Sequence, residues 1–167
     1  MTLNEEGISL NIPDSLRWEK LDEENFYRNT SQLGLKAVDF VFYGKEKIIL
    51  LEIKNYTPNL EENISDADLR ERKRQEIAKR LSPEKINVQL ANKLVSSIYL
   101  VLGKKLKESK RIVFCALLIF PPSLNYYLPI ITASLNNLAT GEENLLKVNI
   151  LVLNEIELAE KIISSVI

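Results

Sequence analysis

The feature of this sequence that most restricts its fold is an apolar run, residues 112–120, which reads IVFCALLIF. The run is too short to span a membrane, which takes about 20 apolar residues. As a strand it must be covered on both faces, because neither face carries a polar side chain to meet water. Pro121 and Pro122 then end it, since proline lacks the N–H group that a sheet ladder needs. We therefore predict a fully buried strand over residues 111–120.

The residues on either side of 44–47 predict a β-hairpin. Residues 37–43 and 48–56 are rich in aromatic and β-branched or apolar side chains, and a Gly-Lys-Glu-Lys turn separates them. Before the hairpin, the pattern over residues 16–21 fits either a short helix or a strand. Residues 22–29 predict a helix, because three acids stand at the start and an arginine near the end. Residues 147–153 predict another strand.

Two helices have clear end signals. Ser82, Pro83 and Glu84 open a long helix, and Gly103 offers a place for it to end. Its apolar stripe repeats about once per turn, at Ile86, Leu90, Leu94, Ile98 and Leu102. The final helix is predicted to have Asn154 as its N-cap and Glu157 as the partner in a capping box. Its predicted buried face consists of Ile156, Ala159, Ile163 and Val166.

The order of these elements predicts an α/β fold. A hairpin comes first, and strands connected by helices follow, with a short helix expected near residues 131–138. This arrangement requires a central mixed β-sheet with helices on both faces. The 167 residues are the length of one domain, which we take to cover residues 1–167. A chain of this length buries enough surface to need no disulfide or structural metal.

The composition excludes several kinds of chemistry. The chain has no histidine and one cysteine, so Ser-His-Asp catalysis, Cys-His catalysis and His- or Cys-rich metal sites are excluded. We expect Cys115 to be a buried core thiol. The net charge is −1, so any nucleic-acid binding has to be local. Residues 1–10 lack the pattern of a signal peptide, and we expect a cytoplasmic protein without a membrane partner.

Three charged residues stand out on the predicted hairpin. A symmetric turn at residues 44–47 pairs Tyr43 with Ile48 and, further along, Asp39 with Glu52. Directly opposed residues in a sheet have Cβ atoms about 4.5–5.5 Å apart, and like charges so placed destabilise it. Lys54 lies two residues beyond Glu52 and points to the same side. Two facing carboxylates on an apolar hairpin therefore need a cation.

A divalent ion would resolve the repulsion. Mg²⁺ prefers carboxylate oxygens and keeps several waters, and Lys54 could hold or deprotonate one of those waters. Such parts suit metal-assisted attack of water on a phosphodiester. The alternative is that Lys54 only neutralises one carboxylate on a solvated edge. We favour the metal site, because both acids interrupt strongly apolar strands and a basic cluster follows.

These residues carry a resemblance to a known family. Asp39, followed twelve residues later by the Leu-Glu-Ile-Lys sequence that ends at Lys54, resembles the PD-(D/E)XK phosphodiesterases, which have the restriction-endonuclease-like fold. More closely, residues 34–40 and 52–56, with residues 89–93 on the long helix, are similar to an uncharacterised group of small bacterial proteins in that superfamily. The resemblance covers roughly residues 17–103. Val38 stands where the superfamily has its leading proline.

The resemblance implies roles and partners. Asp39 and Glu52 would bind Mg²⁺ or Mn²⁺, and Lys54 would be the catalytic lysine. The superfamily's further acid would be Asp22, although Glu23 and Glu24 also qualify. The implied activity is hydrolysis of DNA, with a homodimer as a possible assembly for double-strand cleavage. The alternative is a non-catalytic nucleic-acid-binding or protein-interaction module of the same fold.

Weaker signals accompany this set. The mostly basic residues 70–80 fit either a phosphate-binding patch or a solvated helix face. Gln89 and Lys93 lie one turn apart on the long helix, off its apolar stripe, and either line the site or face solvent. Tyr126 and Tyr127 could stack on bases, but ordinary packing at a strand end is the stronger interpretation.

Overall fold

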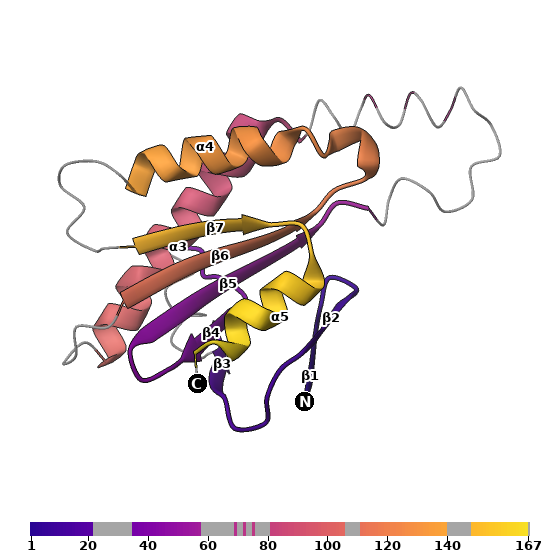
Figure 1. Ribbon diagram of the computed structural model, residues 1–167. Helices are drawn as coiled ribbons and strands as arrows, with labels where there is room; N and C mark the ends of the chain where they lie inside the picture. The colour runs from indigo at the N-terminus through magenta and orange to yellow at the C-terminus, as the bar shows by residue number, and fades with distance from the viewer. Residues whose placement is uncertain are drawn as a thin grey trace.

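A computed structural model describes residues 1–21, 35–57, 69, 72, 75, 81–105, 111–139 and 148–166. Its centre is a five-stranded mixed sheet with helices on both faces, so the predicted α/β class is confirmed (Figure 1). In spatial order the strands are β3 (Arg17–Lys20), β4 (Phe40–Tyr43), β5 (Lys47–Asn55), β6 (Arg111–Ile119) and β7 (Val148–Leu153).

The pairing changes from antiparallel to parallel at β5. β3, β4 and β5 form an antiparallel meander, whereas β5, β6 and β7 are parallel to one another. The parallel pairs need crossovers, which are made through α3 (Pro83–Lys105) and α4 (Tyr127–Ala139). The 3-10 helix η2 (Pro122–Leu124) connects β6 to α4. β6 is therefore the interior strand that its unbroken apolar sequence predicts.

The turn between β4 and β5 sets the register of the candidate site. Tyr43 pairs with Ile48, and Phe40 with Leu51, as predicted from the position of the turn. The N–H of Gly44 donates to the carbonyl of Lys47 at 3.0 Å, which closes the turn. The next opposed pair along this register is Asp39 and Glu52.

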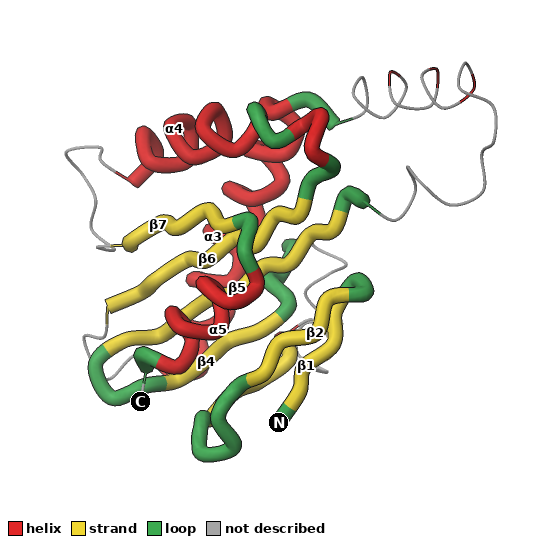
Figure 2. The backbone as a smooth tube through the Cα atoms, turned by 45° about the vertical axis from the view of Figure 1, so that its right-hand side comes forward, coloured by secondary structure: helices red, strands yellow, loops and turns green. Residues whose placement is uncertain are grey.

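Two cores lie on opposite faces of the sheet. Both crossover helices pack on one face, against side chains such as Leu50 and Phe114. This is the expected result for two crossovers of the same, right-handed sense. The other face carries α5 (Ile156–Ser164) and packs around Phe42 and Leu117. Figures 1 and 2 show the sheet between these layers.

An N-terminal hairpin, which the sequence analysis missed, adjoins the second core. It consists of β1 (Thr2–Glu5) and β2 (Ile8–Asn11), and buries Leu3, Ile8 and Leu10. Glu6 and Gly7 connect the strands with positive φ angles, 48° and 76°. Two positive φ values at the centre of a two-residue loop match the twist of the hairpin. The Glu6–Gly7 turn projects toward the end of β5, where it contacts Asn55.

Several predicted element ends are wrong. The N-cap of α5 is Glu155, not Asn154, because the extended backbone continues through residue 155 (φ −122°, ψ 125°), and the cap has no side-chain hydrogen bond. Ile156 is 37 % exposed and not part of the buried face. Gly103 lies inside α3, which continues to Lys105. A helix tolerates an interior glycine at a cost of about 1 kcal/mol.

Other predictions have mixed outcomes. The ambiguous residues 16–21 contribute the strand β3, and α4 begins earlier than the helix expected near 131–138. The helix predicted over residues 22–29 lies outside the described residues, as does most of the segment 58–80. None of the described helices has the length and apolar character needed to cross a membrane.

Candidate functional site

The two predicted acids are buried where β4 stops pairing with β5. Glu52 is 0 % exposed and Asp39 4 % exposed. Both follow directly on the last recorded pair of the β4–β5 ladder, on the face that α3 covers. Buried carboxylates need charge partners or hydrogen-bond donors, because transfer of a charge out of water is costly. The site therefore consists of Asp39, Glu52 and the groups that offset their negative charges.

Carboxylates replace the missing strand partner at this edge of β5. The N–H of Ile53 donates to Asp39 Oδ2 at 2.7 Å, and the N–H of Asn55 donates to Glu6 Oε2 at 2.9 Å. If β4 were longer, its carbonyl groups would accept the hydrogen bonds of these two N–H groups. Carboxylate side chains accept them instead. The bond from Ile53 fixes Oδ2 of Asp39, and Oδ1 lies 3.7 Å from the ammonium group of Lys93.

Lys93 brings a positive charge from α3 into the site. Its Nζ lies 2.5 Å from Glu52 Oε1 and 2.7 Å from Oε2, with the side chain 18 % exposed. The polar pair on the long helix is thus split: Lys93 lines the site, whereas Gln89 is exposed. Lys93 bridges the two acids across the α3–sheet interface.

Lys54 lies on the same side as Glu52, as predicted. Its Nζ is 3.5 Å from Glu52 Oε1 and also contacts Glu6 at the tip of the N-terminal hairpin. The amide nitrogen of the Asn55 side chain donates to the carbonyl of Glu6 at 3.2 Å, which fixes the tip in place. Glu6 was missed by the sequence analysis. An alternating pattern on both sides of Glu6 and Gly7, in TLNEEGISLN, was the signal for a hairpin there.

The pKa values in the site reflect burial and close charges. Burial, followed by repulsion from Asp39, raises the pKa of Glu52 to about 7. Burial also raises the pKa of Asp39, against the attraction of Lys93. For Lys54 burial acts to lower the pKa, but the hydrogen bond to Glu6 and the charges of Glu52 and Asp39 outweigh it and raise the value. The lysine is therefore held as an ammonium ion.

The further acid suggested by the resemblance, Asp22, lies outside the described residues, together with Glu23 and Glu24. Instead, Glu5 and Glu6 of the N-terminal hairpin approach the site. Glu5 pairs with Lys20 at 3.2 Å, and its charge contributes to raising the pKa of Asp39. Within the described part of the chain, the further carboxylates near the acid pair thus come from a hairpin that carried no predicted role.

The donor set fits a hard divalent ion. Oε1 of Glu52 is buried and accepts no hydrogen bond from the described residues. It is in ion-pair contact with the ammonium groups of Lys93 and Lys54. The described residues contain no cluster of three or more His, Cys, Asp or Glu side chains suited to a metal. Mg²⁺ usually binds proteins through one or two carboxylates and completes its shell with water and substrate phosphates. Asp39 and Glu52 together meet that requirement.

Ser97 on α3 fixes the backbone beside Asp39. Its Oγ accepts a hydrogen bond from the buried N–H of Val38 at 2.8 Å, and the serine is 0 % exposed. Ser96 accepts a longer bond, 3.3 Å, from the N–H of Lys36. These two bonds attach the segment before β4 to the same helix that carries Lys93.

We expect Ser97→Ala to destabilise the protein by about 1–3 kcal/mol, because it leaves the Val38 N–H buried and unpaired. Urea unfolding measures the change. Ser96→Ala is the matched control and should cost less, since its bond is longer and the Lys36 backbone is only partly buried. Equal losses for the two variants would contradict the assignment.

Aromatic side chains lie next to the site at the end of β5. Tyr56 stacks on Phe120 with ring centroids 4.9 Å apart, and Tyr127 packs edge-on against Phe120 at 5.9 Å. Burial raises the pKa of Tyr56 to about 12. Tyr127 is buried, as ordinary packing predicts, whereas Tyr126 is 58 % exposed.

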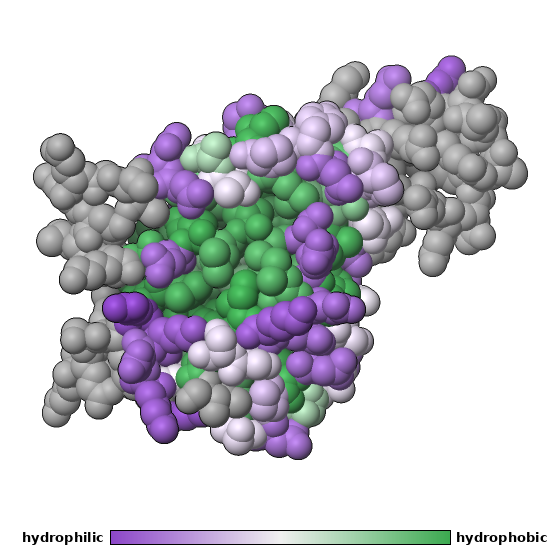
Figure 3. Space-filling view, in the orientation of Figure 1, coloured by the Kyte–Doolittle hydropathy of each residue, from purple (hydrophilic) through white to green (hydrophobic). Residues whose placement is uncertain are grey.

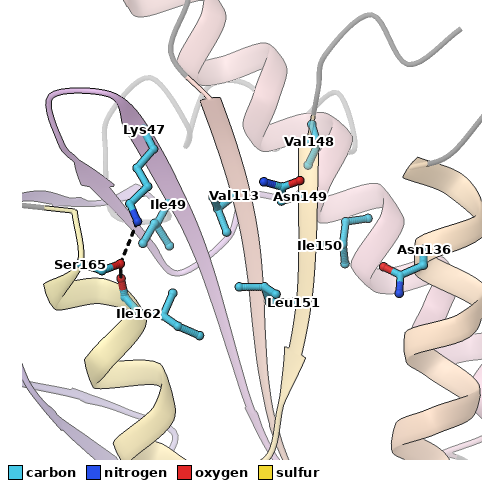
Figure 4. A pocket seen from close by; sticks show the side chains of 10 residues that line it. All are labelled: Lys47, Ile49, Val113, Asn136, Val148, Asn149, Ile150, Leu151, Ile162 and Ser165. Atoms are coloured by element: carbon cyan, nitrogen blue, oxygen red, sulfur yellow. Dashed lines mark hydrogen bonds between the residues drawn. The ribbon is translucent and has the colours of Figure 1, made fainter.

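A hollow of about 590 Å³ lies on the opposite face of the sheet. Its lining is partly apolar, with Ile49, Val113 and Leu151, and also includes the polar side chains of Asn149 and Lys47 (Figure 4). Lys47 Nζ donates to Ser165 Oγ at 2.8 Å. Figure 3 shows apolar surface at the centre of this face. Among the described residues no carboxylate lines the hollow, so these residues do not offer the chemistry of the acid pair.

Cys115 is fully buried in β6, as predicted, and burial raises the pKa of its thiol to about 12.

Comparison with known proteins gave no matching family model, no matching curated protein and no matching solved structure.

Proposed function

We propose that this chain is a divalent-metal-dependent nuclease of restriction-endonuclease-like fold, which hydrolyses phosphodiester bonds in DNA. The observation that carries the proposal is the pair of buried carboxylates on adjacent strands, with Lys54 on the same side. Asp39 follows directly on the β4–β5 ladder opposite Glu52, and Lys54 Nζ lies 3.5 Å from Glu52 Oε1. A purely structural hairpin gains nothing from two opposed buried acids.

Asp39 and Glu52 would hold Mg²⁺ or Mn²⁺. When bound, such an ion supplies a water nucleophile at neutral pH and offsets charge on the phosphate. Lys54 has a different task. Because Glu6, Glu52 and Asp39 together keep its pKa above the ordinary value, we assign Lys54 to the negative charge that develops on the phosphate rather than to proton removal from water.

The chain topology supports the same proposal. The PD-(D/E)XK fold has the order α-β-β-β-α-β with the acids on adjacent strands. The meander β3–β4–β5, the α3 crossover and the parallel strand β6 follow that order, and α4 with β7 is an addition. The described residues before β3 form a hairpin, and the helix expected over residues 22–29, which would carry the family's further acid, lies outside the described residues.

We expect the protein to nick supercoiled DNA in the presence of Mg²⁺ or Mn²⁺, and expect EDTA to prevent nicking. Asp39→Asn and Glu52→Gln should each abolish the reaction, because each removes a metal ligand. Agarose gels measure nicking, and Glu46→Gln, at the opposite end of the hairpin, is the matched control that should keep activity. Nicking by either acid variant at the wild-type rate would contradict the proposal.

One observation favours a second function. Both acids already have a protein cation within reach, since Lys93 contacts Asp39 and Glu52, and Lys54 contacts Glu52. Such compensation suits a non-catalytic nucleic-acid-binding or protein-interaction module. DNA binding without any metal-dependent nicking would favour this alternative. Sedimentation of the DNA complex would also show whether a homodimer forms.

A further inference from the structure

Lys93 occupies the space between the two acids. Its Nζ lies within 2.7 Å of both oxygens of Glu52 and 3.7 Å from Asp39 Oδ1. The residue stands on the sheet-facing side of α3 between Leu90 and Leu94, both buried. The ammonium group therefore reaches the acids from inside the α3–sheet interface.

The two lysines of the site have different partners. Lys54 divides its contacts between Glu52 and Glu6, whereas Lys93 contacts Glu52 and Asp39. Lys93 is thus the cation that bridges the acid pair. A divalent ion bound by Asp39 and Glu52 would need the same oxygens, Oδ1 and Oε1, that now face Lys93.

We propose that Lys93 is an internal counter-ion that competes with divalent metal for Asp39 and Glu52. This inference rests on the proposed function, since it assumes that the acids bind metal. Two cations in contact with the same oxygens repel each other, so Lys93 has to withdraw before the acids can serve as ligands. Its flexible four-carbon stem permits withdrawal without movement of α3. Lys93 thus offsets part of the charge of the acids when no metal is bound, and it lowers their affinity for metal.

The test compares Mn²⁺ binding by wild type and Lys93→Met at pH 8, measured by calorimetry and by electron paramagnetic resonance of free Mn²⁺. Methionine retains most of the stem but removes the charge. Lys85→Met is the matched control, because Lys85 is an exposed lysine on the same helix. We expect Lys93→Met to bind Mn²⁺ about tenfold more tightly, which is the scale of a lost charge-assisted hydrogen bond. Lys85→Met should bind as wild type does.

The outcomes separate this inference from the proposed function. If wild type and Lys93→Met bind Mn²⁺ equally, or the variant binds more weakly, the competition is refuted while the metal site stands. If neither binds at millimolar Mn²⁺, the metal site is refuted and the competition with it. Tighter binding by Lys93→Met but not by Lys85→Met supports both.

A second measurement on the wild-type chain applies if Lys93→Met does not fold. The ¹⁵N-labelled ammonium signal of Lys93, assigned from its loss in Lys93→Arg, should be visible by NMR without metal, because ion-paired ammonium protons exchange slowly. Saturation with diamagnetic Mg²⁺ should shift or remove this signal, and the Lys54 signal should remain. A Lys93 signal that stays unchanged while Mg²⁺ raises the Tm would overturn the inference.

Discussion

Without metal, the free energy of unfolding of the wild-type protein should fall by about 3 kcal/mol as the pH rises from 4.5 to 7, because the buried Glu52 loses its proton. The Glu52→Gln variant should not show this fall. Burial raises the pKa of Glu52 from its ordinary 4.5 to about 7. Between these values the folded protein binds a proton that the unfolded chain has released, so the free energy of unfolding falls as the pH rises. Each pH unit in this interval corresponds to about 1.4 kcal/mol. The contribution is complete below pH 4.5 and lost through pH 7.

Urea unfolding of both proteins at pH 4.5 and pH 8, in EDTA, measures this contribution. The other titrating groups are present in both proteins, so the difference between them reports the titration of Glu52 together with its coupling to Asp39. The glutamine variant should be the more stable protein at pH 8, and the advantage should disappear at the lower pH. Asp39→Asn should act in the same direction, since burial raises the Asp39 pKa too. A difference that does not change with pH would contradict this account.

Lys54→Met should reduce the rate of DNA hydrolysis about 10²–10³-fold and leave Mn²⁺ binding intact. The expected loss is that of removing one preorganised charge from the reacting phosphate. Metal binding should survive, because Asp39 and Glu52 remain and a positive charge near the ion is removed. Single-turnover cleavage and calorimetry measure the two quantities.

Lys47→Met is the matched control for this prediction. Lys47 is the first residue of the same strand, β5, and its ammonium group donates to Ser165 at the opposite end of the sheet. The variant should cleave DNA and bind Mn²⁺ as wild type does. If Lys54→Met instead lost Mn²⁺ binding together with hydrolysis, the assignment of the lysine to the phosphate would be wrong.

Local sequence alone determined the acid pair. The turn at residues 44–47 fixes which residues of β4 and β5 face each other, and a strand alternates its side chains strictly, so the turn also determines that Asp39 approaches Glu52 and that Lys54 shares its side. The sequence also predicted the interior position of β6, because a strand without polar side chains has to be buried on both faces. These features depend on residues close in sequence, because side chains repeat every two residues in a strand and every 3.6 residues in a helix.

Only the tertiary structure decided which charges compensate the acids. Glu6 reaches Lys54 from the N-terminal hairpin, and Lys93 reaches Glu52 from α3, across sequence separations of 48 and 41 residues. Sequence periodicity showed that Lys93 lies off the apolar stripe, but not whether that side of the helix meets water or the sheet. The prediction that Ile156 is buried was wrong for the same reason. Helix and strand periods specify faces within one element, whereas contacts between elements depend on how the whole chain packs.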